Sequence, residues 1–225
     1  MNPDDVPEFS VIAIDGPAAS GKSTVARKLA KRLGFSYVNS GALYRGIAWL
    51  TSEHHIRPTD AGAVCGQMRK SVFSFDLKGK EMVFSVDGVN PEPHLRDEEV
   101  NRTVSAISAI AEVREFLVAH LRTFLTKDDL VMEGRDIGSI VFPDTPYKFY
   151  IDASLEVRAQ RRAIQGQRDD LFFRDRADSS RRSSPLTIAE DAHVIDSSTL
   201  TIDGVVGEIV GRLKMQGLGE ALRLD

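Results

Sequence analysis

The 225-residue sequence predicts an α/β protein with a parallel sheet covered by helices on both faces. Short apolar stretches alternate with amphipathic helical patterns near both ends of the chain. A glycine-rich loop joins the first apolar stretch to the first helical pattern. The middle of the chain alternates residue by residue instead, which is typical of an antiparallel ribbon. We therefore expect one core, formed by residues 9–54 and 130–225, and an insertion at 55–129.

The first element is the uninterrupted apolar run Val11 to Ile14, which has the character of a strand buried on both faces. The loop that follows fits a phosphate-binding pattern of glycine, four residues, then Gly-Lys-Ser. Its N–H groups and the helix dipole would converge on phosphate, Lys22 adds a full charge, and Ser23 can ligate Mg²⁺. A glycine-rich turn with an incidental lysine is the structural alternative. The predicted nucleotide-binding residues are Gly16, Pro17, Ala18, Ala19, Ser20, Gly21, Lys22, Ser23 and Thr24.

A helix and a second strand follow the loop. Val25, Leu29 and Leu33 recur at four-residue steps while basic residues fill the opposite side, and Gly34 offers a left-handed stop. Residues 37–39 then form a short strand candidate.

The next elements lead into the insertion and through it. Residues 42–50 carry one apolar face and predict a helix, whereas the mixed, polar stretch 51–65 indicates a helix end and a connection. Alternating aromatic and aliphatic residues around a Lys-Gly-Lys turn predict an antiparallel ribbon at 72–89. Helical spacing then predicts helices at roughly 97–109 and 112–126.

The α/β pattern resumes after the insertion. Residues 130–132 and 147–151 are buried-strand candidates, and Ser154 can cap a helix. A short strand at 193–195 and a helix over 202–213 complete the chain. Because ligands gather at the carboxyl ends of parallel strands, the glycine loop and the segments after the second and third core strands should meet at one crevice.

Composition and charge restrict the functional classes. The net charge is −4, so a nucleic-acid-binding role would need a local basic patch. The single Cys65 excludes an internal disulfide and a multi-cysteine zinc site, and suits a reducing compartment. Residues 1–8 are unlike a signal peptide, and no apolar run approaches the roughly 20 residues of a membrane span. We expect a cytoplasmic protein that binds neither nucleic acid nor membrane.

Polar clusters follow two of the predicted strands, at 40–45 and 133–136, and arginines crowd the polar loop 168–182. A phosphate loop combined with arginines suits phosphoryl transfer, because guanidinium groups stabilise the charge that develops on the transferred group. No histidine or cysteine stands in a nucleophile-like constellation. A phosphate acceptor, which is already ionised at neutral pH, would need no general base.

Six motifs stand in order along the chain: IDGPAASGKS at 14–23, NSGALYR at 39–45, EGRDIG at 133–138, VFPD at 141–144, RRSSPL at 181–186 and IDSSTL at 195–200. Together they resemble the bacterial cytidylate kinases, a family of nucleoside monophosphate kinases. The resemblance implies a three-layer P-loop kinase with a parallel five-stranded sheet, an insertion over the monophosphate and a short lid at about 167–184. It also implies a monomer that transfers the γ-phosphoryl group of ATP to CMP or dCMP with Mg²⁺.

The resemblance implies an acceptor site formed by Ser40, Arg45 and Arg135 around the monophosphate and by Ser105, Arg114 and Asp136 at the cytosine edge. Cytosine offers an N4 donor beside acceptors, so Asp136 can accept from N4 and orient Arg114 towards N3. From the residues alone, Arg114 would be a solvated helix face. The structural alternatives for Ser40 and Asp136 are a cap of the next helix and a cap of the turn after the strand.

The lid residues implied by the resemblance are Arg174, Asp178 and Arg181, which would contact sugar and phosphates. The predicted catalytic cations are Lys22, Arg135, Arg174 and Arg181. The lid is shorter than in many family members, which leaves open whether Arg168 or Arg176 substitutes. A solvated charge run is the alternative for this loop.

Two other functions stay open. One is a related kinase that acts on another monophosphate, such as UMP or AMP. The other is a nucleotide-gated switch without a phosphate acceptor, against which the clusters at 40–45 and 133–136 argue, because a switch needs no second anion site. The sequence does not separate CMP from dCMP, or ATP from GTP.

Overall fold

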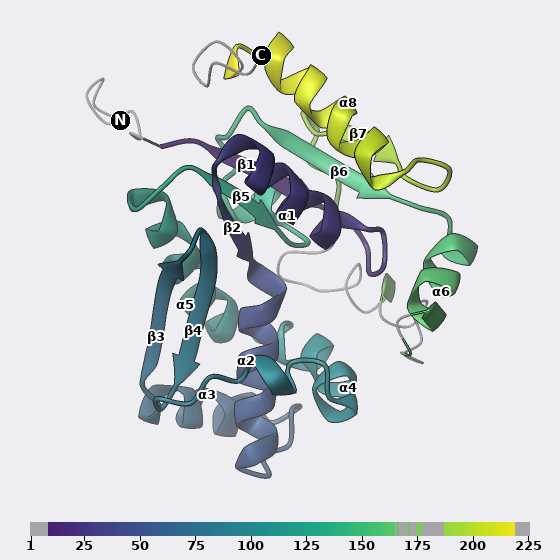
Figure 1. Ribbon diagram of the computed structural model, residues 1–225. Coiled ribbons are helices and arrows are strands. Elements are labelled where there is room, and N and C mark those ends of the chain that lie inside the picture. The colour runs from purple at the N-terminus through teal and green to yellow at the C-terminus, as the bar shows by residue number, and fades with distance from the viewer. Residues whose placement is uncertain (1–8, 165, 167–170, 172–174, 177–186, 219–225) are drawn as a thin grey trace.

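The computed structural model describes residues 9–164, 166, 171, 175, 176 and 187–218 (Figure 1). One seven-stranded sheet runs through it in the order β3-β4-β2-β5-β1-β6-β7. The strands are β1 (Val11–Asp15), β2 (Ser36–Asn39), β3 (Phe73–Lys78), β4 (Glu81–Val86), β5 (Leu130–Glu133), β6 (Lys148–Asp152) and β7 (His193–Asp196).

Helices connect most of these strands. The α-helices are α1 (Lys22–Leu33), α2 (Ser40–Glu53), α3 (Ala61–Lys70), α4 (Glu98–Ile107), α5 (Ala111–Thr123), α6 (Leu155–Ile164) and α8 (Ile202–Met215). Two short 3₁₀ turns, η1 (Glu92–His94) and η2 (Phe124–Thr126), flank α4 and α5. A turn of π-helix, η3 (Ile137–Val141), follows β5 and was not expected from the sequence. In the described part of the chain, no helix has the length and apolar character needed to cross a membrane.

The five parallel strands of the predicted core are confirmed, in the order β2-β5-β1-β6-β7. The predicted ribbon also forms, as the antiparallel pair β3 and β4. It extends the central sheet instead of standing apart, because β4 pairs with β2 where Tyr37 lies beside Glu81. The sheet therefore has seven strands, two more than expected.

Helices cover both faces of the sheet, as Figure 1 shows. Ile12 and Ile14 of β1 pack into an apolar cluster with α1 and α8, while Val11 and Ala13 point into a second cluster with α2 and α5. Consecutive residues of one strand thus enter opposite cores. This explains why the strand appears in the sequence as a continuous apolar run.

The helix end and the connection predicted within residues 51–65 are confirmed, since α2 ends at Glu53 and α3 begins at Ala61, but the beginning of α3 was not predicted. The Asp60 side chain caps α3 by accepting the Ala63 N–H at 3.0 Å. Val64, Cys65 and Met68 are the buried residues of α3. With so few apolar residues on the buried face, the helical period was not visible in the sequence.

The ribbon packs closely on α2. A Cβ atom at Gly46 would lie 2.4 Å from the Phe84 ring, so the two elements meet with only a hydrogen atom between them. Phe73 and Phe75 pack with Phe116 of α5, with ring centroids 5.1 and 6.3 Å apart. These partly buried rings pack against the apolar cluster that β1, α2 and α5 share, so the predicted aromatic core of the insertion is continuous with the core of the sheet.

Candidate active site

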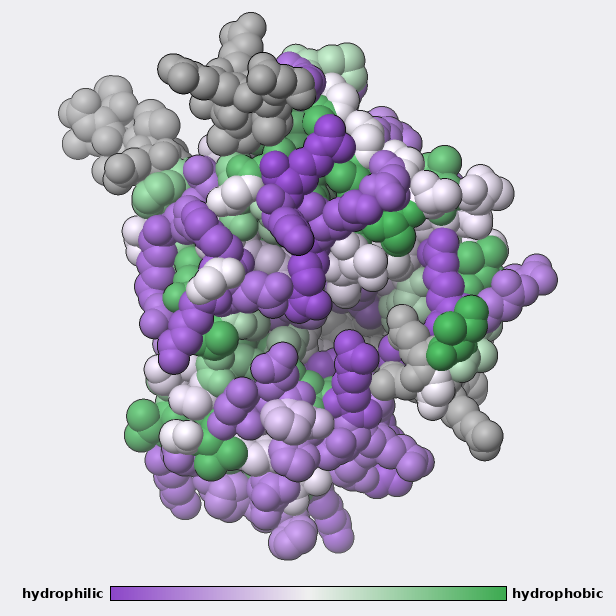
Figure 2. Space-filling model, viewed as in Figure 1, coloured by the Kyte–Doolittle hydropathy of each residue, from purple (hydrophilic) through white to green (hydrophobic). Residues whose placement is uncertain are grey.

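A cleft of about 1030 Å³ lies at the carboxyl ends of the parallel strands. The loop after β1, the start of α2 and the segment after β5 line it, together with residues of β4, α4 and α5. Figure 2 shows a recess between the sheet-bearing part and the part that carries α2 and α4, bordered by many hydrophilic residues. Open α/β sheets bind ligands at this position.

The glycine loop bends sharply before the amino terminus of α1. Ala19 and Gly21 have φ angles of 60° and 92°, which bring the chain round to Lys22. The Lys22 side chain is buried, and its Nζ donates to the Pro17 carbonyl at 3.0 Å. A cation and the N–H groups of a helix terminus therefore face the same space, which suits phosphate. The predicted strand, loop and helix are confirmed.

Glu133, the last residue of β5, links this loop to β2. Its carboxylate accepts the Ser23 hydroxyl at 2.9 Å and the Tyr37 hydroxyl at 2.7 Å, and only 2 % of the residue is exposed. Burial and the neighbouring carboxylate raise the pKa of Tyr37, so its hydroxyl remains a donor. Glu133 was predicted only as a member of a polar cluster. Its place at the end of a central strand was the available signal.

Ser40 and Arg45 line the cleft from α2. The Ser40 hydroxyl is buried and donates to the carbonyl of the last β5 residue at 2.9 Å. A Cβ at Gly134 would lie 2.5 Å from that hydroxyl, so the next residue must be glycine. Arg45 donates from Nη1 to the Leu95 carbonyl at 2.8 Å and to Asn101 Oδ1 at 2.7 Å. Arg45 thereby joins α2 to the inserted segment.

Arg114 of α5 and Asp136 form a buried ion pair at the far side of the cleft, and each is 4 % exposed. Arg114 also donates to the Ser108 carbonyl at 3.2 Å and lies over the Tyr44 ring at 5.4 Å. Its Nε is buried and finds no hydrogen-bond partner among the described residues. This burial excludes the alternative of a solvated helix face. Ser105 of α4 lines the same cleft.

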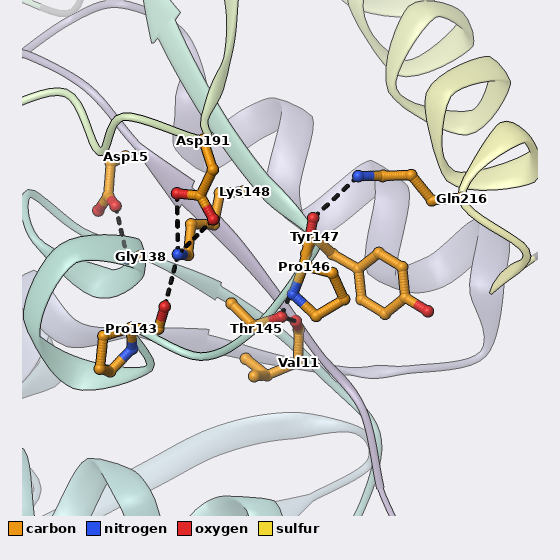
Figure 3. A network of polar contacts seen from close by, with 10 residues as sticks. All are labelled: Val11, Asp15, Gly138, Pro143, Thr145, Pro146, Tyr147, Lys148, Asp191 and Gln216. Atoms are coloured by element: carbon orange, nitrogen blue, oxygen red, sulfur yellow. Dashed lines mark hydrogen bonds and ion pairs between the residues drawn. The ribbon is translucent and has the colours of Figure 1, made fainter.

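Arg135 and Asp15 tie the segment after β5 to the glycine loop. Arg135 donates from Nη1 to the Gly16 carbonyl at 2.8 Å. The buried Asp15 carboxylate accepts the N–H groups of Ile137 and Gly138, each at 2.8 Å, and Figure 3 shows the second contact. Burial raises the pKa of Asp15 to about 7. Asp15 was not predicted as a site residue.

Two arginines of α6 hold the glycine loop from its other side. Arg158 Nη1 donates to the Ala18 carbonyl at 3.2 Å, and Arg161 Nη1 donates to the Ser20 carbonyl at 3.1 Å. The Ser197 hydroxyl also donates to the Ser20 carbonyl, at 2.8 Å. Neither arginine was predicted as a site residue. Their three-residue spacing places both on one helix face, which was the available signal.

The structure brings most predicted residues into one cleft. Those that line it are Ala18, Ala19, Gly21, Lys22, Ser23, Thr24, Ser40, Arg45, Ser105, Arg114, Arg135 and Asp136. Gly16, Pro17 and Ser20 belong to the same loop but are buried behind this lining. The predicted lid residues Arg174, Asp178 and Arg181 lie outside the described residues, so their roles stay predictions.

A sequence model of the cytidylate kinase family matches residues 12–215. Relatives named cytidylate kinase occur in several bacteria. The one from Caldanaerobacter subterraneus subsp. tengcongensis is 41 % identical over 93 % of this chain and 96 % of the relative. Those from Desulforamulus reducens and Clostridium botulinum are 39 % and 37 % identical over 90 % of this chain, covering 96 % and 97 % of the relatives.

Solved structures show the same fold at much lower identity. A gluconokinase from Sinorhizobium meliloti matches with a TM-score of 0.52 and 12 % identity, over 97 % of this chain and 99 % of that one. At this identity the likeness is one of fold alone.

Proposed function

The chain belongs to the cytidylate kinase family, and we propose that it transfers the γ-phosphoryl group of ATP to CMP or dCMP. The products would be ADP and CDP or dCDP. The observation that carries this proposal is a single cleft with two different halves. The phosphate loop with Lys22 lies in one half, and the buried Arg114–Asp136 pair lies in the other.

The loop half suits the triphosphate of ATP. Lys22 would stabilise the charge that develops on the transferred phosphoryl oxygens, and Arg135, one residue before Asp136, would act from the acceptor side. Arg158 and Arg161 hold the carbonyl groups of the loop, which turns its N–H groups towards the phosphates. This rigid loop would keep the donor phosphates in place without a cost at the moment of transfer.

The residues beside the loop also fit Mg²⁺. The Ser23 hydroxyl and the Glu133 carboxylate lie 2.9 Å apart, and Mg²⁺ favours such oxygen ligands together with phosphate. We propose that Ser23 and Glu133 hold the ion, the former directly as predicted from the sequence. When bound, Mg²⁺ neutralises negative charge on the phosphates.

The insertion half suits a nucleoside monophosphate. We propose that residues 55–129 cover this acceptor, that Ser40, Arg45 and Arg135 hold its phosphate, and that Ser105, Arg114 and Asp136 read its base. The Nε of Arg114, which has no hydrogen-bond partner in the described part of the chain, supports this assignment, because a buried donor without a partner costs free energy until a ligand satisfies it. Arg45 is bonded to Leu95 and Asn101 here, so a phosphate would compete with these contacts.

A panel of acceptors tests the function directly. ADP release is measured with ATP and CMP, dCMP, UMP or AMP. We expect CMP and dCMP to exceed UMP in kcat/KM by about a hundredfold, because Asp136 accepts from an amino group that UMP lacks. A preference for UMP or AMP would assign a related kinase. Tight ATP binding without turnover of any acceptor would assign a switch.

We further propose that the protein acts as a monomer in the cytoplasm and has no nucleic-acid partner. The net charge of −4 and nucleotide-sized dimensions of the cleft support small molecules as partners. Sedimentation at the concentration used for the acceptor panel tests the oligomeric state.

A further inference from the structure

Asp15 is a buried acid for which the proposed chemistry has no task. It is the last residue of β1, and 7 % of it is exposed. Both carboxylate oxygens are used: Oδ1 accepts the Ile137 N–H and Oδ2 accepts the Gly138 N–H. Burying a carboxylate is costly, so two backbone bonds on one such group indicate a specific structural demand.

Both bonds hold the backbone next to Asp136. Ile137 and Gly138 directly follow Asp136, which itself has non-helical angles of φ −151° and ψ 28°. On the preceding side, the Gly134 N–H donates to the Ile14 carbonyl at 3.0 Å. The end of β1 therefore holds the chain both before and after Asp136.

The same segment is confined from the opposite side by Lys148. A Cβ at Gly138 would lie 3.0 Å from the Lys148 side chain, whose Nζ is held by Asp191 at 2.7 Å and by the Pro143 carbonyl (Figure 3). Gly138 thus sits between a carboxylate that accepts its N–H and an alkyl chain against its Cα. Little freedom remains for the turn that carries Asp136.

We propose that Asp15 is a positioning residue for acceptor recognition, which holds the turn after β5 so that Asp136 meets Arg114 and the base. This role rests on the proposed function. Asp15 acts through Asp136 and touches neither nucleotide. Because Gly16 follows it in the chain, the same residue joins the donor loop to the acceptor-reading turn.

The substitution Asp15→Asn tests this role. Asparagine keeps one carbonyl oxygen but turns an amino group towards the second N–H, so one of the two bonds is lost. We expect the KM for CMP to rise about tenfold or more while the KM for ATP changes less than about twofold, because small misplacements of recognition groups have large effects. The discrimination between CMP and UMP should fall in parallel.

Thr145→Val is the matched control. The Thr145 hydroxyl is buried and donates to the Val11 carbonyl at 2.6 Å, at the opposite end of β1 from Asp15 (Figure 3). Its loss should lower stability but leave the ratio of the two KM values unchanged. If Asp15→Asn raised the KM values for CMP and ATP equally, as a general loss of stability would, the proposed role of Asp15 would be overturned.

A double-mutant cycle adds a second readout. In an Asp136→Asn background, Asp15→Asn should have little further effect on the KM for CMP, whereas full additivity would contradict action through Asp136. If Asp15→Asn does not fold, Gly138→Ala is the second variant. It keeps the Asp15 carboxylate but displaces the Gly138 N–H, and it must also raise the KM for CMP more than the KM for ATP. Wild-type turnover of CMP in the same assay separates the two proposals, since its absence overturns the proposed function itself.

Discussion

Lys22 combines a full charge with a buried position at the start of α1. Because the ammonium group acts on phosphate charge, Lys22→Ala should lower kcat by about 10²- to 10³-fold while the fold survives. Turnover and the thermal midpoint are measured together. Arg32→Ala, an exposed change on the same helix, is the control. Loss of folded protein in Lys22→Ala alone would point to a structural role.

Arg114 carries a second prediction at this scale. Arg114→Ala removes one partner of a buried ion pair, so stability should fall by about 3–5 kcal/mol and the KM for CMP should rise far more than that for ATP. Arg114→Lys keeps the charge but loses the planar fork, and should show the CMP defect with less loss of stability. Urea unfolding and initial rates measure the two effects. Arg102→Ala, which removes an exposed ion pair, is the control and should change neither stability nor the KM for CMP. If Arg114→Ala raised the KM values for CMP and ATP equally, Arg114 would not read the base.

Single residues were predictable where the motif is local. The phosphate loop is contiguous, so its pattern alone located Lys22 and Ser23. Glu133 lies 110 residues from Ser23, and Arg161 lies 141 residues from Ser20, so no local pattern joins them. For Arg114, the residues alone favoured a solvated helix face, which its burial excludes. Only the family resemblance predicted it as a site residue.

Among the elements, the contact between α2 and the ribbon offers a matched pair of glycines. A Cβ at Gly46 meets Phe84 at 2.4 Å, whereas a Cβ at Gly66 in α3 meets nothing within 4 Å. Gly46→Ala should therefore destabilise the protein by about 1–3 kcal/mol through overpacking, and Gly66→Ala should stabilise it by about 0.5–1 kcal/mol through helix propensity. Denaturant unfolding measures both. If both substitutions changed the free energy of unfolding in the same direction, this explanation would be contradicted.

The strands and helices of the core were predictable because apolar spacing and glycine stops are local signals. The place of the ribbon in the sheet was not, because it depends on one residue pair between β4 and β2, Glu81 with Tyr37. The π-helical turn was not predictable either, since two N–H bonds to Asp15, more than 120 residues away, hold its start.

At the scale of the whole molecule, Asp15 predicts a pH dependence of stability. Its pKa rises from 3.8 to about 7 on folding, so the native state retains a proton that the unfolded chain releases. Asp15 therefore costs stability progressively as the pH rises between these values, and the cost is constant above about pH 7. The thermal midpoint of Asp15→Asn, relative to wild type, should shift in the variant's favour from about pH 4 to about pH 7 and then level off. Scanning calorimetry measures it; a pH-independent difference would contradict the prediction.

The strand order also has a consequence for synthesis. β5 begins at residue 130 yet lies between β1 and β2, the first two strands of the chain. While the ribosome is still translating the inserted segment, β1 and β2 have no neighbour to join them, and their apolar edges stay open. The nascent chain must therefore pass Glu133 before the centre of the sheet can close, and fragments that end earlier should aggregate.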